Sequence, residues 1–176
     1  NVLLYLATLQ AGAVYLPLNT AYQAQEVKYF LGDASPRVFV CTPQRAFELR
    51  RVGTECGVEQ VLTQGTQADG CVVEQTQRTA PLSSIAQRAP DDLASICYTS
   101  GTTGRSKGAM ITHGNLLSNA EALVQLWYFT SNDVLLHALP LYHIHGLFVA
   151  LHCALLSGAT ILLQPKFDAR GALESL

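Results

Sequence analysis

Apolar residues recur with two different spacings along this chain of 176 residues. Apolar side chains at every third or fourth position predict helices over residues 2–11, 21–31, 43–52, 115–127 and 147–156, and another after Asp168. Short, nearly continuous apolar runs predict strands over residues 13–18, 37–41, 60–62, 93–98, 109–112, 134–138 and 160–163. Because strands and helices alternate, the sequence predicts an α/β fold in which a largely parallel sheet is flanked by helices.

A polar stretch separates two sections of this pattern. Residues 63–92 are rich in Gln, Thr, Gly and Ala, contain a weakly helical run over 82–88, and are typical of a surface excursion or linker. The sections on either side are 1–62 and 93–176. Because Asn1 already lies in a helical pattern and Met110 is the one methionine, we expect residues 1–176 to be a fragment of one larger domain.

Composition and charge disfavour several classes of protein. Apolar residues make up 49% of the chain, which is more than a disordered chain contains. Eleven basic and thirteen acidic residues give a net charge of −2 without a basic stripe, which disfavours a nucleic-acid or anionic-membrane binder. No apolar run reaches the roughly 18–20 residues that span a bilayer. The five cysteines form no C-x-x-C pair, which favours free thiols and a cytoplasmic location over disulfides or a zinc site.

The stretch Y-T-S-G-T-T-G-R-S-K-G at residues 98–108, here named the glycine-rich loop, lies between two predicted strands. Its glycines let backbone N–H groups approach a ligand, its hydroxyls add donors, and Lys107 adds a positive charge. Many donors beside a cation match a polyphosphate, whereas a flexible surface loop is the weaker alternative. The order Ser106-Lys107-Gly108 departs from the Walker A motif, and the glycine spacing departs from the dinucleotide-binding fingerprint.

A second group of polar residues lies in L-P-L-Y-H-I-H-G-L-F at residues 139–148, here named the histidine segment. His143 and His145 flank Ile144, and such a pair can bind a metal ion. No Asp, Glu or Cys lies nearby at ligand spacing, which disfavours a metal site. We expect the other three histidines to be hydrogen-bonded structural residues: His113, His137 and His152.

The glycine-rich loop closely resembles the phosphate-binding signature of the adenylate-forming superfamily, which includes acyl-CoA synthetases, luciferases and nonribosomal-peptide adenylation domains. In that superfamily the loop holds the β- and γ-phosphates of ATP while a carboxylate attacks the α-phosphate. The resemblance implies that Lys107 is catalytic, since its charge stabilises the departing pyrophosphate, and that Thr102 lies near Mg²⁺. The ATP-binding residues that it implies are Thr99, Ser100, Gly101, Thr102, Thr103, Gly104 and Lys107.

The histidine segment resembles the acyl-pocket motif of acyl-CoA synthetases, P-L-Y-H-x-x-G. That match implies that His143 is a catalytic, gating residue near the carboxylate, and that His145 and Gly146 also bind the acid. His145 would place a hydrogen-bond donor or a positive charge where many fatty-acyl enzymes carry an apolar residue, which suits a second carboxylate. The segments at residues 6–22, 137–150 and 162–168 also resemble bacterial malonyl-CoA synthetases in particular. Together with His145, they make the chain similar to that group.

The resemblance implies an AMP-forming acid–CoA ligase that converts a carboxylate and ATP into an acyl-adenylate and then into acyl-CoA. Malonate is the expected acid, with ATP, Mg²⁺ and coenzyme A as the other small molecules and the remainder of the same chain as the partner. The alternatives are a medium- or long-chain fatty-acid or aryl-acid ligase, a carrier-loading adenylation domain, and a non-catalytic nucleotide-binding module. The superfamily's adenine and ribose contacts and its C-terminal catalytic lysine do not occur here, so we expect the isolated chain to be inactive.

Overall fold

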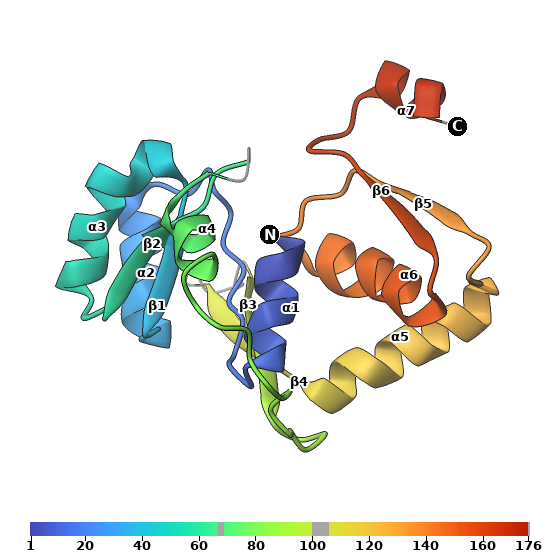
Figure 1. Ribbon diagram of the computed structural model, residues 1–176, viewed down its shortest axis with the longest axis horizontal. Coiled ribbons are helices and arrows are strands. Elements are labelled where there is room, and N and C mark those ends of the chain that lie inside the picture. Colours follow the sequence, from blue (N-terminus) through green and yellow to red (C-terminus); the bar gives the residue numbers. More distant parts are fainter. Residues whose placement is uncertain (67–68, 100–105, 176) are drawn as a thin grey trace. The chain divides into compact units, whose positions relative to one another are not determined.

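The computed structural model describes residues 1–66, 69–99 and 106–175, which form two compact units. The small unit consists of Leu18–Ser83, and the large unit combines Asn1–Pro17 with Ser84–Leu176 (Figure 1). The first 17 residues therefore fold with the C-terminal part of the chain and not with the residues that directly follow them.

In the small unit, helices α2 and α3 pack on a parallel pair of strands. The elements are α2 (Ala24–Ala34), β1 (Val38–Cys41), the 3-10 helix η1 (Pro43–Arg45), α3 (Ala46–Glu55), β2 (Gln60–Thr63) and α4 (Cys71–Thr76). In β1 and β2, Cys41 lies opposite Thr63, and η1 with α3 forms the crossover between the strands. The apolar faces of both helices enclose one buried cluster, made of Val27, Leu31, Cys41, Leu49, Val52 and Val58.

The prediction of a helix over residues 82–88 is wrong. A short helix forms elsewhere in the polar stretch, at α4 (Cys71–Thr76). Contacts with β2 hold the start of α4: the backbone N–H of Cys71 donates to Thr63 Oγ1 at 3.1 Å, and that of Thr63 donates to Cys71 Sγ at 3.0 Å. Residues 82–88 instead bond to the end of the first helix, because Ala86 N–H donates to the Gln10 carbonyl oxygen at 2.9 Å. In both places, hydrogen bonds to residues distant in the sequence determine whether a helix forms. The spacing of apolar residues does not reveal such bonds.

The large unit contains two further pairs of strands and five helical elements with known bounds. These are α1 (Val2–Gln10), β3 (Leu93–Thr99), β4 (Lys107–Thr112), α5 (His113–Trp127), β5 (Val134–His137), the π-helix η2 (His145–Ala150), α6 (Leu151–Ser157), β6 (Thr160–Leu163) and α7 (Ala169–Ser175). Its core joins residues from α1, β3, α5, η2 and α6, namely Tyr5, Ala94, Cys97, Leu116, Leu147, Phe148 and Leu151. As predicted, the Asp168 side chain caps the last helix, accepting a hydrogen bond from Gly171 N–H at 2.7 Å.

The α/β fold class is confirmed, and the strands of the described residues pair in three separate two-stranded sheets. Two pairs are parallel, β1 with β2 and β5 with β6, and each is joined through helices as a β-α-β unit. The third pair, β3 with β4, is antiparallel, unlike the largely parallel sheet that the sequence predicts. The reason is its connection: the glycine-rich loop is too short for a crossover helix and allows only a hairpin.

The strand predicted over 13–18 is wrong, because only Tyr15 makes a β-bridge there, to Ser95 of β3. Tyr15 N–H donates to the Ala94 carbonyl oxygen at 2.9 Å, and Ile96 N–H donates to the Tyr15 carbonyl oxygen at 3.1 Å. Pro17, two positions later, lacks the N–H that would continue the ladder. The apolar run therefore adds a single bridge to the hairpin.

A hydrogen-bonded pair, Tyr5 and His152, lies in the core of the large unit. The Tyr5 hydroxyl lies 2.8 Å from His152 Nε2, and the two rings stack with their centroids 5.7 Å apart. Burial raises the pKa of Tyr5 and lowers that of His152 from 6.5 to about 4. The histidine is therefore neutral in the folded protein at neutral pH, and His152 has the structural role that the sequence predicts.

We expect His152 to make the free energy of unfolding depend on pH between 6.5 and about 4. In this range the unfolded chain binds a proton at His152 and the folded chain does not. Stability therefore falls as the pH falls through this range, by at most roughly 3–4 kcal/mol, and the effect of this group vanishes well above pH 6.5. Urea unfolding at several pH values measures the effect in wild type and in His152→Gln, which has no titrating group but can still accept the Tyr5 hydrogen bond. A pH dependence that is identical in both proteins would contradict this assignment.

Cys41, Cys56, Cys71, Cys97 and Cys153 are all free thiols. Within the described parts of the chain, no helix combines the length and the apolar character that crossing a membrane requires.

Candidate functional site

The glycine-rich loop connects the two strands of the β3–β4 hairpin. Thr99 ends β3 and Lys107 begins β4, and the two residues lie opposite each other in the ladder. The Thr99 hydroxyl donates to the Lys107 carbonyl oxygen at 3.5 Å, which joins the two ends of the loop. Five of the predicted phosphate ligands lie outside the described residues: Ser100, Gly101, Thr102, Thr103 and Gly104.

The hairpin places Lys107 at the end of a strand with its side chain exposed. A strand restricts the backbone of this residue, while its exposed ammonium group remains accessible from solvent. Gly108 follows it and allows close packing inside the hairpin, since a Cβ there would lie 2.9 Å from Ile96 Cγ2. The structure therefore brings together Thr99 and Lys107, and it gives Gly108 a local role in packing.

The histidine segment forms a compact turn between β5 and α6. The backbone N–H of His143 donates to the Pro140 carbonyl oxygen at 3.2 Å, and that of Leu147 donates to the His143 carbonyl oxygen at 3.0 Å. Gly146 is buried, and a Cβ there would collide with the Pro140 carbonyl oxygen. Gly146 is thus required for the close approach of the two ends of the turn.

The side chains of His143 and His145 are exposed, so both can meet a ligand. The ring of His143 lies against that of Tyr142, with 4.5 Å between the centroids. His145 begins the π-helix η2, a distorted turn of a kind that is frequent at functional sites. The helix predicted over 147–156 therefore exists, but it begins two residues earlier, at His145, and its first part is a π-helix. The spacing of apolar residues did not indicate either feature.

His137 is a residue of this region whose role the sequence did not indicate. Its side chain is 1% exposed, and its Nε2–H donates to the Gly146 carbonyl oxygen at 2.8 Å. The backbone N–H of Leu139 donates to its Nδ1 at 3.3 Å. His137 is hydrogen-bonded, as expected, but both bonds go to the histidine segment. The signal available in the sequence was a histidine at the end of a short apolar run.

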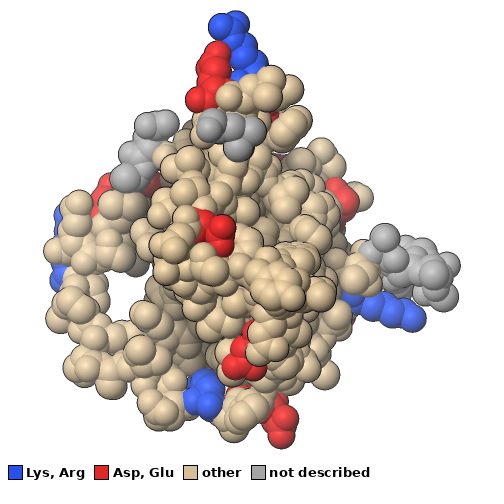
Figure 2. Space-filling model, turned by 90° about the vertical axis from the view of Figure 1, so that its right-hand side faces the viewer, with Lys and Arg blue, Asp and Glu red and all other residues tan. Residues whose placement is uncertain are grey.

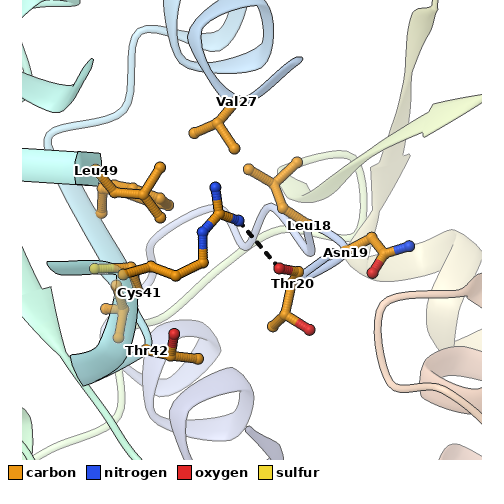
Figure 3. A pocket seen from close by; sticks show the side chains of 10 residues that line it. Leu18, Asn19, Thr20, Val27, Cys41, Thr42 and Leu49 are labelled. Atoms are coloured by element: carbon orange, nitrogen blue, oxygen red, sulfur yellow. Dashed lines mark hydrogen bonds between the residues drawn. The ribbon is translucent and has the colours of Figure 1, made fainter. Parts of the chain in front are cut away.

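Other parts of the structure offer weaker candidates for a site. Among the described residues, no group of three His, Cys, Asp or Glu side chains is placed to hold a metal ion. In the small unit, Arg45 and its neighbours line a cavity of about 50 Å³, and the guanidinium donates to the Thr20 carbonyl oxygen at 3.1 Å (Figure 3). This space suits one or two water molecules and is far too small for a nucleotide.

On the face of the molecule seen in Figure 2, Lys and Arg side chains are few and form no large cluster. A binding site for a large polyanion needs clustered cations, which this face does not present.

Comparison with known proteins identifies close relatives. The family model described as AMP-binding enzyme matches residues 1–175. The malonate–CoA ligase ACSF3, mitochondrial, of Mus musculus is 34% identical over 168 residues, which are 96% of this chain and 28% of that protein. The 4-coumarate–CoA ligase 3 of Oryza sativa is 35% identical over an alignment of 177 positions, which covers 98% of this chain and 32% of that protein.

A solved structure extends the similarity to three dimensions. The crystal structure of ATP-bound MatB from Rhodopseudomonas palustris matches with a TM-score of 0.94 and 46% sequence identity. The match covers 98% of this chain and 34% of the MatB chain. The chain thus spans about a third of the length of the proteins that it resembles.

Proposed function

Because this chain belongs to the AMP-binding enzyme family, we propose that the whole protein is an ATP-dependent acid–CoA ligase with malonate as its acid. The observation that carries the proposal is the similarity to a malonate–CoA ligase, 34% identical over 96% of this chain. The similarity of fold to ATP-bound MatB supports ATP as a substrate. The names of the ligases support coenzyme A as the acceptor of the acyl group.

The proposed reaction has two steps. A carboxylate oxygen of malonate attacks the α-phosphorus of ATP, the bond to the pyrophosphate group breaks, and malonyl-adenylate and pyrophosphate form. The thiol of coenzyme A then gives its proton to water, and its sulfur forms a bond to the acyl carbon. The bond from this carbon to the phosphate oxygen breaks, and AMP leaves with its pair of electrons. Both steps need stabilisation of negative charge on a leaving group, which fixed donors and cations supply.

The glycine-rich loop is proposed to bind the phosphates of ATP. Thr99 and Lys107 stand at the two ends of the loop, joined through the ladder and the Thr99 hydroxyl. The exposed ammonium group of Lys107 is proposed to stabilise the charge that gathers on the pyrophosphate. Mg²⁺ is proposed as the counter-ion of the phosphates, with the Thr102 hydroxyl as its partner in this chain.

The histidine segment is proposed to bind malonate. His143 is proposed to lie beside the carboxylate that reacts, and His145, together with the Gly146 backbone, beside the remainder of the acid. An exposed histidine can donate a hydrogen bond to a second carboxylate, whereas an apolar wall leaves that charge without a partner. The cytoplasmic location expected from the cysteines remains part of the proposal, although the similar mouse ligase is named as mitochondrial.

The second candidate is an aryl-acid ligase, favoured by the 35% identity to 4-coumarate–CoA ligase 3. A carrier-loading adenylation domain would share the first step and transfer the acyl group to a carrier protein. A non-catalytic nucleotide-binding module would share only the binding of ATP.

Exchange of labelled pyrophosphate into ATP tests the class of reaction. We expect the purified whole protein to catalyse this exchange only when a carboxylic acid is present, because pyrophosphate must re-form ATP from an acyl-adenylate. Exchange that does not depend on an acid, or release of ADP and phosphate, would contradict the proposed function. Formation of acyl-CoA in the same mixture distinguishes the ligase from a carrier-loading domain.

A further inference from the structure

One buried imidazole joins the two ends of the histidine segment. The Nδ1 atom of His137 accepts the Leu139 N–H at 3.3 Å, so this nitrogen carries no proton. The proton of the neutral ring therefore resides on Nε2, which donates to the Gly146 carbonyl oxygen at 2.8 Å. This assignment of the tautomer follows from the hydrogen bonds alone.

His137 is itself held by a rigid element. It is the last residue of β5 and lies opposite Leu163 of β6 in the parallel ladder. Its carbonyl oxygen accepts a hydrogen bond from Gln164 N–H at 2.9 Å. The backbone of His137 is thus fixed by the β-α-β unit, while its side chain binds the turn, and a rigid support of this kind is what a precise site needs.

Between the two bonds lies the part of the chain that carries His143. The bond from His143 N–H to the Pro140 carbonyl oxygen, 3.2 Å, and the contact of Gly146 with Pro140 close the turn on itself. These local contacts define the shape of the turn. Leu147 and Phe148 hold the end of the segment in the core, and the two His137 bonds attach the turn to β5 at Leu139 and at Gly146.

We propose that His137 is a positioning residue, whose neutral imidazole fixes the histidine segment to β5 and thereby sets the place of His143 and His145 relative to the bound acid. The catalytic consequence of this inference rests on the proposed function. Loss of the imidazole would leave the buried Gly146 carbonyl oxygen and the Leu139 N–H without their partner, and the segment would shift to regain one. A shift of about 1 Å in a group that binds substrate is enough to lower activity roughly 100-fold.

Three variants of the whole protein separate the two hydrogen bonds. His137→Ala removes both. The side-chain oxygen of His137→Asn lies about where Nδ1 lies and can accept from Leu139, and the amide nitrogen of His137→Gln lies about where Nε2 lies and can donate to Gly146. Val52→Ala, which truncates a buried core residue of the small unit, is the control for a general loss of stability.

The kinetic test compares the effect of each substitution on the KM for malonate with its effect on the KM for ATP. In His137→Ala we expect kcat/KM for malonate to fall roughly 10–100-fold, with most of the loss in the KM for malonate and the KM for ATP changed less than about two-fold. His137→Gln and His137→Asn should each recover part of the loss, and Val52→Ala should affect both substrates alike. Equal changes in both KM values in His137→Ala would mean that the residue is merely structural and would overturn the proposal.

Hydrogen exchange in the absence of substrate tests the positioning independently of the reaction. We expect the amides of Leu139 and Leu147 to exchange roughly ten-fold faster in His137→Ala, and protection of Leu139 to return in His137→Asn. If the wild-type protein activates no acid, the proposed function fails and this exchange result alone decides the role of His137. Unchanged exchange in His137→Ala would overturn the proposal whether or not the protein is a ligase.

Discussion

Replacement of Lys107 by Ala is expected to slow the formation of acyl-adenylate roughly 100–1,000-fold, while thioester formation from supplied acyl-adenylate changes far less. The reason is that the ammonium group is proposed to serve the pyrophosphate, which has left before coenzyme A attacks. Lys107 begins β4 opposite Thr99, so its removal leaves the loop joined at both ends. Release of pyrophosphate in a single turnover measures the first step, and acyl-CoA formation from synthetic malonyl-adenylate measures the second.

Lys166→Ala provides the matched control, because Lys166 is also an exposed lysine of the large unit and lies between β6 and α7. This variant should keep both rates within about two-fold of wild type, since an exposed charge away from such a site contributes little. Equal losses in the two steps of Lys107→Ala would refute the role assigned to this residue.

His145→Leu is expected to lower the preference for malonate over butyrate, measured as the ratio of the two kcat/KM values, by about 5–150-fold. The substitution removes a donor proposed to face the second carboxylate of malonate and leaves that charge poorly compensated, at a cost of roughly 1–3 kcal/mol. Butyrate has no second charge, so an apolar side chain at the start of η2 should harm its reaction less or improve it. The side chain of His145 is exposed in this chain, so the substitution should leave the core intact.

His113→Leu makes the same chemical change outside the histidine segment, at the start of α5. Its ratio of malonate to butyrate activity should remain that of wild type. If the ratio is unchanged in His145→Leu as well, the histidine does not face the acid and the preference for malonate must come from other residues.

Much of the fold could be predicted from the sequence, because its elements depend on local pattern. The observed bounds of strands such as β6 (Thr160–Leu163) and of helices such as α1 lie within one or two residues of the bounds predicted from apolar spacing. At α5, Thr112 and Asn115 form reciprocal hydrogen bonds of 3.1 Å that start the helix where a capping pattern allows it. The errors at residues 13–18 and 82–88 arise where a distant partner, and not local spacing, determines the conformation.

The candidate site was predictable to a smaller extent. Its two motifs are recognisable from residue types, and the structure places Thr99 opposite Lys107 and leaves His143 and His145 exposed. The role of His137 was not predictable, since it depends on a carbonyl oxygen nine positions later that comes near only when the turn closes. The expected roles of the individual site residues remain proposals, and the variants described above test them.

The kcat/KM of the purified whole protein for different acids tests the central claim most directly, with AMP, pyrophosphate and acyl-CoA quantified in the same reaction. Malonate, butyrate, a long-chain fatty acid and 4-coumarate are the four acids to compare. Malonate–CoA ligase activity predicts the highest kcat/KM for malonate, with AMP, pyrophosphate and malonyl-CoA formed in equal amounts. A higher kcat/KM for the long-chain acid or for 4-coumarate would contradict it.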